Sequence, residues 1–239
     1  MRKWSQIAAD PNAKAAKTWR LSVLNAARRE PVKNRIAYLE EIVRGKRVLD
    51  VGAVAHTAVM AGTAEWLHRA ISQSAAYCLG VDVLEEEVKK LQAMGYNVRC
   101  ADITQEDLAG EERFDVMIVG EVIEHLGEPG QLFEAGERLL VSGGRMVLTT
   151  PNPYYWKRMR NALCRWYRRV ESVDHVTMLF PSGMAELAER AGMELESYRG
   201  VYRHSTMVGL KKLLAATVVQ AEVFCETMIY EFWRNGPGP

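Results

Sequence analysis

Three short apolar runs constrain the fold of this chain most strongly. They cover residues 47–52, 77–83 and 114–121. Their Val, Ile and Leu residues do not alternate with polar residues, which is typical of strands covered on both faces in a parallel sheet. Each run ends on small or acidic residues, namely Asp50 with Gly52, Asp82, and Glu121. Because open α/β sheets bind ligands beyond the carboxyl ends of their strands, the sequence predicts a nucleotide-type site there.

Helical segments alternate with these strands along the chain. Periodic apolar residues predict helices over residues 84–94, 129–140 and 181–191. Further strands are expected over residues 97–100, 145–150 and 193–202. This alternation predicts an α/β fold with a doubly wound, mostly parallel, Rossmann-like sheet.

Three parts are predicted along the chain. Residues 1–45 should form two amphipathic helices separated at Pro31, which cover either the sheet edge or the bound ligand. Residues 46–205 should form the main domain, with an insertion over 153–176. Residues 206–239 are expected to form a long apolar helix and a loose tail. This helix either packs on the core or forms a homodimer or membrane-surface contact.

The composition favours a soluble cytoplasmic protein. Lys and Arg number 31 against 30 Asp and Glu, so there is no general attraction to DNA or to acidic membranes. The four cysteines are scattered without a C-x-x-C pair, which fits a reducing compartment and neither a disulfide framework nor a zinc site. We find no apolar signal-peptide core and no uncharged apolar run of the ~18 residues needed for a membrane span.

The order of these parts resembles the class I S-adenosylmethionine-dependent methyltransferases over roughly residues 45–202. VLDVGA (48–53) is similar to the first strand and Gly-rich turn of that family, and GVDV (80–83) to its second strand. FDVMIVGEVIEHL (114–126) resembles the fourth strand of a subgroup that includes ubiquinone-biosynthesis O-methyltransferases and sugar or polysaccharide methyltransferases. The sequence from Gly143 to Pro153 resembles the fifth strand of the same subgroup.

The resemblance implies that S-adenosyl-L-methionine binds at this edge and leaves as S-adenosyl-L-homocysteine. The implied cofactor-binding residues are Asp50, Gly52, Ala53, Asp82, Val83, Asp102, Ile103 and Glu121. Asp82 suits the ribose because two carboxylate oxygens match the two donors of a vicinal diol. For Asp50, Asp102 and Glu121 the alternative is a hydrogen-bonding role in the fold. The chain departs from the family at the turn, where small side chains replace its repeated glycines.

Glu121, Glu124, His125 and His175 have two interpretations. Carboxylates and imidazoles together form a divalent-metal set, and this one resembles the metal site of small-RNA 2′-O-methyltransferases and of some ubiquinone O-methyltransferases. The same run of residues also occurs in family members without metal, so we predict no metal site. His125 and His175 are then the candidate catalytic residues, because histidine can take a proton from an acceptor hydroxyl near neutral pH.

The insertion holds six basic and five aromatic residues over residues 154–169. Its aromatic residues are expected to pack, while its arginines are candidates to bind an anionic group on the acceptor. We therefore predict O-methylation of a small-molecule or glycan acceptor. One alternative is an RNA 2′-O-methyltransferase with the Glu/Glu/His/His metal site. The other is a catalytically inactive, cofactor-binding partner subunit, which the missing glycines favour.

Overall fold

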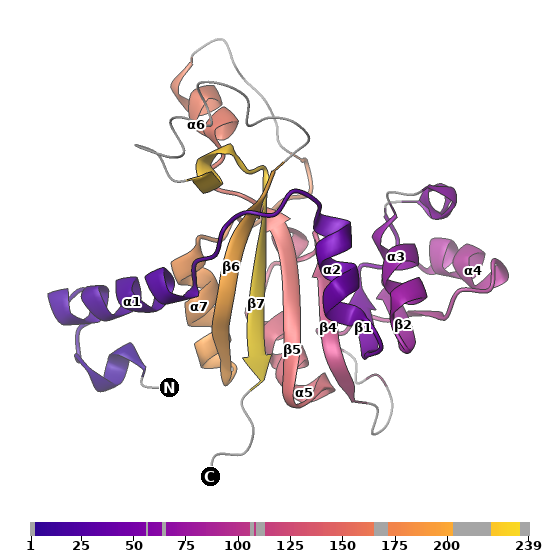
Figure 1. Cartoon of the computed structure of the whole chain (residues 1–239), viewed down its shortest axis with the longest axis horizontal. Helices are drawn as coiled ribbons and strands as arrows, with labels where there is room; N and C mark the ends of the chain where they lie inside the picture. The colour runs from indigo at the N-terminus through magenta and orange to yellow at the C-terminus, as the bar shows by residue number, and fades with distance from the viewer. Residues whose placement is uncertain are drawn as a thin grey trace.

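The computed structural model describes residues 3–55, 57–63, 66–105, 108, 113–164, 172–202 and 221–234. Within these ranges seven strands form one sheet in the order β3-β2-β1-β4-β5-β7-β6 (Figure 1). The strands are β1 (Arg47–Val51), β2 (Tyr77–Asp82), β3 (Val98–Cys100), β4 (Phe114–Gly120), β5 (Leu140–Pro151), β6 (Met193–Val201) and β7 (Thr227–Arg234). β1 to β5 are parallel, and β7 is antiparallel to both β5 and β6. The predicted doubly wound, mostly parallel sheet is confirmed.

Helices cover both faces of this sheet (Figure 1). They are α1 (Lys14–Ala27), α2 (Arg35–Val43), α3 (Leu67–Ser74), α4 (Glu85–Ala93), α5 (Gly130–Leu139), α6 (Trp156–Leu163) and α7 (Pro181–Arg190). Short 3-10 helices occur at η1 (Trp4–Gln6), η2 (Ala58–Gly62), η3 (Ile123–His125) and η4 (Ala221–Phe224). Each helix predicted between strands is present, with ends that differ by a few residues.

Two hydrophobic cores lie on the opposite faces of the sheet. Successive residues of a strand point to opposite faces, so Met117 and Ile118 of β4 enter different cores. Met117 packs in one core with Phe133 of α5. Ile118 packs in the other with Leu39 of α2 and Ile71 of α3. All five side chains are fully buried, and each such burial is worth about 1.5–3 kcal/mol.

The N-terminal segment forms two helices, as predicted, and runs along the outer strand between them. Arg28 and Val32 make parallel bridges to Tyr198 and Val201 at the edge of β6. α1 extends past this edge of the sheet, while α2 lies over the sheet (Figure 1). The side chain of Asn34 caps α2 by accepting a hydrogen bond from the amide of Ala37 at 3.1 Å.

The prediction of a long C-terminal helix over residues 206–239 is wrong for residues 221–234, which are the part of this segment that the structure describes. Thr227–Arg234 form β7, which lies between β5 and β6. A strand that is buried on both faces carries a continuous apolar run, and periodicity alone does not distinguish such a run from a buried helix. The β-branched and aromatic residues of this run favour the strand. The main sheet therefore includes β7. Residues 227–234 form no helix that could make the expected homodimer contact. Residues 206–220 lie outside the described ranges.

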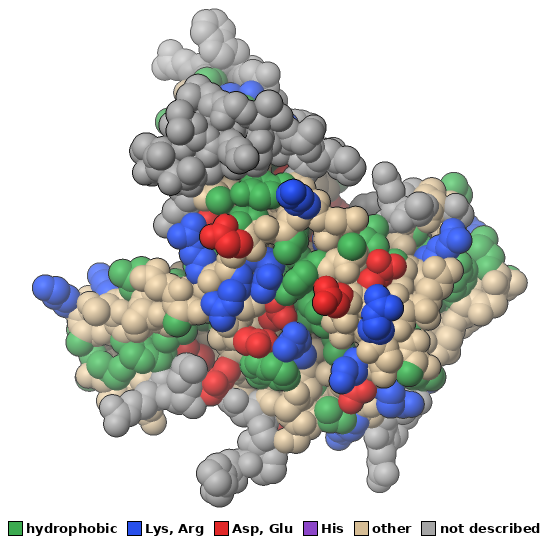
Figure 2. All heavy atoms as spheres, in the orientation of Figure 1, with side chains coloured by type: hydrophobic (Ala, Val, Ile, Leu, Met, Phe, Trp, Pro, Cys, Tyr) green, Lys and Arg blue, Asp and Glu red, His purple; other side chains and the backbone are tan. Residues whose placement is uncertain are grey.

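The surface shows no dominant charge on the face seen in Figure 2. Acidic and basic side chains are interspersed there, in keeping with the net charge of +1. Cys78, Cys100, Cys164 and Cys225 are all free thiols. None of the helices described is long and apolar enough to cross a bilayer.

Candidate active site

A cavity of about 650 Å³ lies at the carboxyl ends of β1, β2 and β4. The eight residues predicted to bind the cofactor all line it: Asp50, Gly52, Ala53, Asp82, Val83, Asp102, Ile103 and Glu121. His125 lines it as well. His175 is not among the lining residues, and its ring packs against that of His125, with the two centroids 4.9 Å apart. The parallel sheet thus brings these residues together from distant parts of the sequence.

The turn after β1 keeps its shape with a single glycine. Gly52 has a φ of +79°, and a Cβ there would clash with the side chain of Val122, so glycine is required on both counts. The next two residues are held by side chains: the indole Nε1 of Trp66 donates to the carbonyl of Ala53 at 2.9 Å. The amide of Val54 donates to Oδ2 of Asp82, also at 2.9 Å.

Asp82 is a buried carboxylate at the end of β2. Its Oδ1 accepts a hydrogen bond from the amide of Leu84 at 3.1 Å, and its Oδ2 accepts the one from Val54. Burial raises the pKa of Asp82, and these backbone donors only partly offset that effect. Each carboxylate oxygen has a second lone pair, so both oxygens can accept further donors from a ligand in the cavity.

Asp50 is paired with a histidine that the sequence analysis did not single out. Its Oδ2 lies 2.8 Å from Nδ1 of His68, and the two side chains are 3% and 1% exposed. His68 also packs against Trp66 and Tyr96, with ring centroids 5.2 and 5.9 Å away. This cluster lies directly beneath the turn after β1.

Glu121 has a strained backbone at the tip of β4. Its φ of +55° makes it the only residue other than glycine with positive φ among those described. Such strain occurs preferentially at functional sites. Its Oε1 accepts a hydrogen bond from Nη1 of Arg35 at 3.0 Å, and the same nitrogen lies 3.4 Å from Oγ1 of Thr149. Among the described residues that line the cavity, Arg35, from α2, is the only lysine or arginine.

His125 forms a pair with Asp174. Its Nδ1 lies 3.2 Å from Oδ2 of Asp174, and both residues line the cavity. The hydroxyl of Ser172 and the nearby imidazoles lower the pKa of Asp174, so its carboxylate is ionised at neutral pH. A carboxylate at Nδ1 fixes the proton of a neutral imidazole on that nitrogen. Nε2 of His125 is then the nitrogen free to accept a proton.

Glu124 is a buried carboxylate beside this pair. It is 2% exposed, and its Oε2 accepts a hydrogen bond from Oγ1 of Thr150 at 3.0 Å. Its Oε1 and Nδ1 of His175 are both buried without a hydrogen-bond partner within the described part of the chain. Ligand atoms of Glu124, His125 and His175 lie within 4.8 Å of one another. The fourth predicted member of this set, Glu121, is instead engaged by Arg35.

Burial, and then the negative charge of Glu121, raise the pKa of Glu124 to about 7 from 4.5. The folded state therefore holds this proton more tightly than the unfolded state. The resulting stabilisation is fully present below pH 4.5 and is lost as the pH rises through about 7.

We expect Glu124→Gln to be more stable than the wild type at about pH 8, because the amide carries no charge to bury. A gain of ~1 kcal/mol corresponds to a rise in Tm of about 2–4 °C for a chain of this size. Thermal unfolding in chelator-containing buffer at about pH 8 and about pH 5 measures this rise in Tm. The difference in Tm between variant and wild type should be smaller at the lower pH. Glu128→Gln, at an exposed position on the same connection, is the control. An equal gain at both pH values would contradict the prediction.

The donor set of the cavity fits the cofactor implied by the sequence. S-adenosylmethionine carries a sulfonium, an ammonium and a carboxylate, next to a ribose diol and an adenine. Within the described part of the chain, five carboxylates line the cavity, which suits the two cationic groups: Asp50, Asp82, Asp102, Glu121 and Asp174. Arg35 offers a cation to the cofactor carboxylate, and Val83 and Ile103 offer apolar surface to the adenine. The volume is in the usual range of small-molecule sites, about 300–1,000 Å³.

Three residues that line this cavity were not predicted from the sequence, namely Arg35, Trp66 and His68. Arg35 starts the helix that precedes β1, but its partner Glu121 is 86 residues away in sequence, and no local pattern shows that the two side chains meet. A signal existed for His68, because it shares the inward face of α3 with Ile71 and both are buried. A histidine on an apolar helix face next to a glycine-poor turn is a candidate partner for the strand-end carboxylate.

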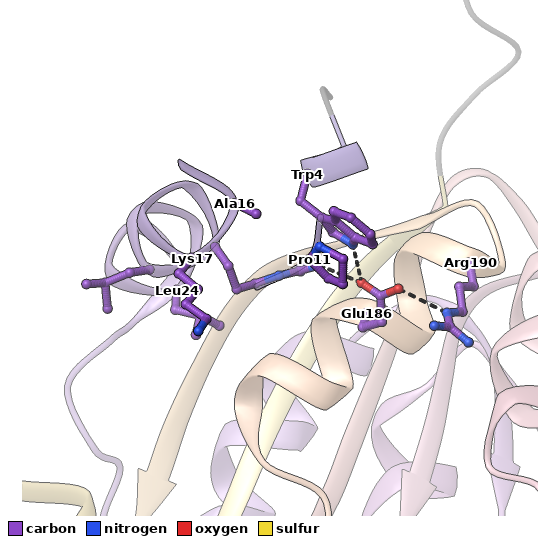
Figure 3. Close-up of a pocket in the computed structure, with 9 residues that line it drawn as sticks. Trp4, Pro11, Ala16, Lys17, Leu24, Glu186 and Arg190 are labelled. Atoms are coloured by element: carbon purple, nitrogen blue, oxygen red, sulfur yellow. Dashed lines mark hydrogen bonds and ion pairs between the residues drawn. The ribbon is translucent and has the colours of Figure 1, made fainter. Parts of the chain in front are cut away.

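A second cavity, of about 620 Å³, lies between α1 and α7, away from the predicted site residues (Figure 3). Glu186 of α7 accepts hydrogen bonds there from Trp4 at 2.9 Å and Arg190 at 3.0 Å. Arg20 of α1 also binds Glu186, at 2.8 Å, and Glu189, at 2.8 Å. These contacts attach the N-terminal segment to α7.

Comparisons with known proteins agree with this architecture. Residues 24–198 match a family model described as "Methyltransferase domain". The ubiquinone biosynthesis O-methyltransferase of Coxiella burnetii is 25% identical over 213 residues, which cover 84% of this chain and 84% of that protein. An S-adenosylmethionine-dependent methyltransferase from Mesorhizobium loti has a TM-score of 0.53 at 18% identity, covering 80% of this chain and 92% of its own. Magnesium protoporphyrin IX methyltransferase from Synechocystis, solved with bound S-adenosylhomocysteine, has a TM-score of 0.55 at 14% identity. The match covers 98% of this chain and 93% of that protein. These two structures share the fold.

Proposed function

Because this chain belongs to the S-adenosylmethionine-dependent methyltransferase family, we propose that it methylates an oxygen atom of a small-molecule or glycan acceptor. The observation that carries the choice of oxygen is the pairing of His125 with Asp174 at the cavity. A hydroxyl must lose its proton on methylation, and an imidazole oriented by a carboxylate is suited to take it. The curated relative named a ubiquinone biosynthesis O-methyltransferase is consistent with this choice.

The proposed mechanism divides the work between cofactor and protein. The cofactor supplies a methyl group made electrophilic by the sulfonium, so the protein mainly has to align the acceptor oxygen with it. Nε2 of His125 accepts the hydroxyl proton, and Asp174 holds the imidazole in the required tautomer and stabilises its charged form. His175 packs edge-on against His125 and limits its rotation.

Cofactor binding is assigned to the residues at the strand ends. Asp82 would accept hydrogen bonds from both ribose hydroxyls, and Asp102 and Ile103 would border the adenine. Arg35 would pair with the cofactor carboxylate, while Asp50 and Glu121 would attract its cationic groups. We also propose a cytoplasmic location, because all four cysteines are free thiols.

The acceptor side of the pocket is assigned to the insertion over residues 153–176. Its described helix, α6, lies beyond the carboxyl end of β5, at the edge of the sheet that holds the cavity (Figure 1). Arg158 donates to the carbonyl of Asn152 at 3.0 Å and so anchors this segment to β5. The guanidinium of Arg160 lies 5.3 Å from the ring centroid of Trp156. Arg165 lies outside the described residues.

Neutralising Arg160, as in Arg160→Gln, is expected to raise KM for an anionic acceptor about tenfold and to leave cofactor affinity unchanged. A charge-assisted hydrogen bond of about 1.5 kcal/mol accounts for such a change. Arg158→Gln should act in the same direction but also lower the Tm, because it loses its bond to Asn152. Steady-state kinetics with acceptor and cofactor varied separately measure the effect. Equal loss of both affinities would show that α6 only supports the fold.

The second candidate is an RNA 2′-O-methyltransferase with a metal site. It is favoured by the close approach of Glu124, His125 and His175 and by the two buried atoms without partners. Against it, Glu121, the fourth residue of the predicted metal set, is bound to Arg35. We therefore propose a metal-independent transfer. The inactive partner subunit remains the third candidate.

Methyl transfer from labelled cofactor to phenolic, sugar and RNA acceptors separates the three candidates. We expect transfer to a hydroxylated small molecule or glycan that survives a chelator. Loss of activity with chelator and recovery with Mg²⁺ or Mn²⁺ would contradict this and favour the RNA enzyme, whose RNA binding should also weaken steeply with salt. Cofactor binding without transfer to any acceptor would favour the inactive subunit.

A further inference from the structure

The buried pair of Asp50 and His68 lies where a repeated-glycine turn would otherwise shape the cofactor site. Three backbone amides attach the turn to β2: Gly52 and Ala53 donate to the carbonyl of Val81, and Val54 donates to the carboxylate of Asp82. None of these three bonds involves the carboxylate of Asp50. The bond from Nδ1 of His68, at 2.8 Å, does so.

The packing around His68 leaves its ring little freedom. Trp66 and Tyr96 pack against it, and Gly80 of β2 lies under its edge. A Cβ on Gly80 would be 2.6 Å from Cε1 of His68, which is closer than carbon atoms approach. Because Gly80 has no side chain, the imidazole fits into a slot in the sheet with its Nδ1 toward Asp50.

We propose that His68 is a positioning residue of the cofactor site. It donates from Nδ1 to Oδ2 of Asp50 and thereby holds this carboxylate toward the cavity that both residues line. Trp66, at the start of the same helix, holds the carbonyl of Ala53. The beginning of α3 thus supplies two side-chain donors to the turn. These donors fix a conformation that glycines alone would not enforce, because glycine is the most flexible residue.

Two substitutions separate the hydrogen bond from packing. Asn places an amide donor near the position of the imidazole Nδ1, whereas Leu fills similar space without a donor. By calorimetry, His68→Leu is expected to bind S-adenosylhomocysteine about tenfold more weakly or worse, while His68→Asn stays within about threefold of the wild type. Thermal unfolding of both variants controls for folding. A purely structural role would weaken binding in step with the loss of Tm and would give no recovery with Asn.

The tautomer of His68 gives a readout that does not depend on activity or on a variant. In nitrogen-15 spectra of the wild type, His68 should carry its proton on Nδ1. Three results would overturn the proposal: a proton only on Nε2, wild-type affinity in His68→Leu, or a tenfold loss in His68→Asn. If His68→Leu does not fold, the tautomer and the Asn variant still decide. A wild type that binds no cofactor contradicts the family assignment instead, while the tautomer continues to test the bond to Asp50.

Discussion

Asp82→Ala is expected to weaken the binding of S-adenosylmethionine and S-adenosylhomocysteine by about 2–4 kcal/mol, or about 30- to 1,000-fold. The wild-type carboxylate is largely desolvated at the end of β2, and burial raises its pKa. Two donors from the ribose relieve that unfavourable desolvation and form charge-assisted bonds, which alanine cannot do. The substitution also removes the acceptor for the amide of Val54, so the turn after β1 loses one of its anchors.

Calorimetric titration of both ligands measures this effect. Asp115→Ala is the matched control, because Asp115 lies at the opposite end of the sheet, near the start of β4, and accepts a hydrogen bond from the amide of Arg47 at 2.9 Å. It should change stability and leave cofactor affinity as it is. Unchanged affinity in Asp82→Ala would remove the ribose assignment and with it the assignment of the cavity.

His125→Gln is expected to lower kcat by about 10²- to 10⁴-fold and to leave cofactor affinity nearly unchanged. The loss follows from removing the base that takes the acceptor proton, and glutamine keeps most of the side-chain volume. Asp174→Asn should lower kcat in the same direction, because an amide oxygen orients the imidazole but does not stabilise its charged form. Single-turnover kinetics with a hydroxyl acceptor separate this chemical step from product release.

His175→Gln is the comparison for His125. The sequence analysis treated the two histidines as equal candidates, but only His125 lines the cavity. We therefore expect the smaller loss at His175, through the packing of its ring against His125. A His125→Gln enzyme with full kcat, or a larger loss at His175, would contradict the assignment of the base.

The parts that the sequence predicted well depend on local signals. Residues such as Asp50 and Asp82 lie at the carboxyl ends of apolar runs that are recognisable as buried strands. The geometry of parallel sheets then places these residues at one edge of the sheet. The doubly wound, mostly parallel sheet follows from the alternation of strand and helix along the chain. These predictions needed no knowledge of contacts between distant residues.

The parts that were missed depend on contacts between distant segments. Arg35 reaches Glu121 only because α2 packs over the sheet, and the pairing of His68 with Asp50 requires the slot left by Gly80. The C-terminal run over Thr227–Arg234 was assigned the wrong element because burial on both faces removes the alternation that marks a strand. In each case contacts between distant segments determined the outcome. The local signals for His68 and for β7 were present, but they did not specify these contacts.

The proposed function depends on the binding of S-adenosylmethionine in the cavity at the ends of β1, β2 and β4. The most direct measurement is calorimetric titration of the wild-type protein with S-adenosylhomocysteine, repeated with Asp82→Ala. We expect saturable binding at one site by the wild type and a loss of at least about 30-fold in the variant. No binding by the wild type, or equal binding by both proteins, would contradict it.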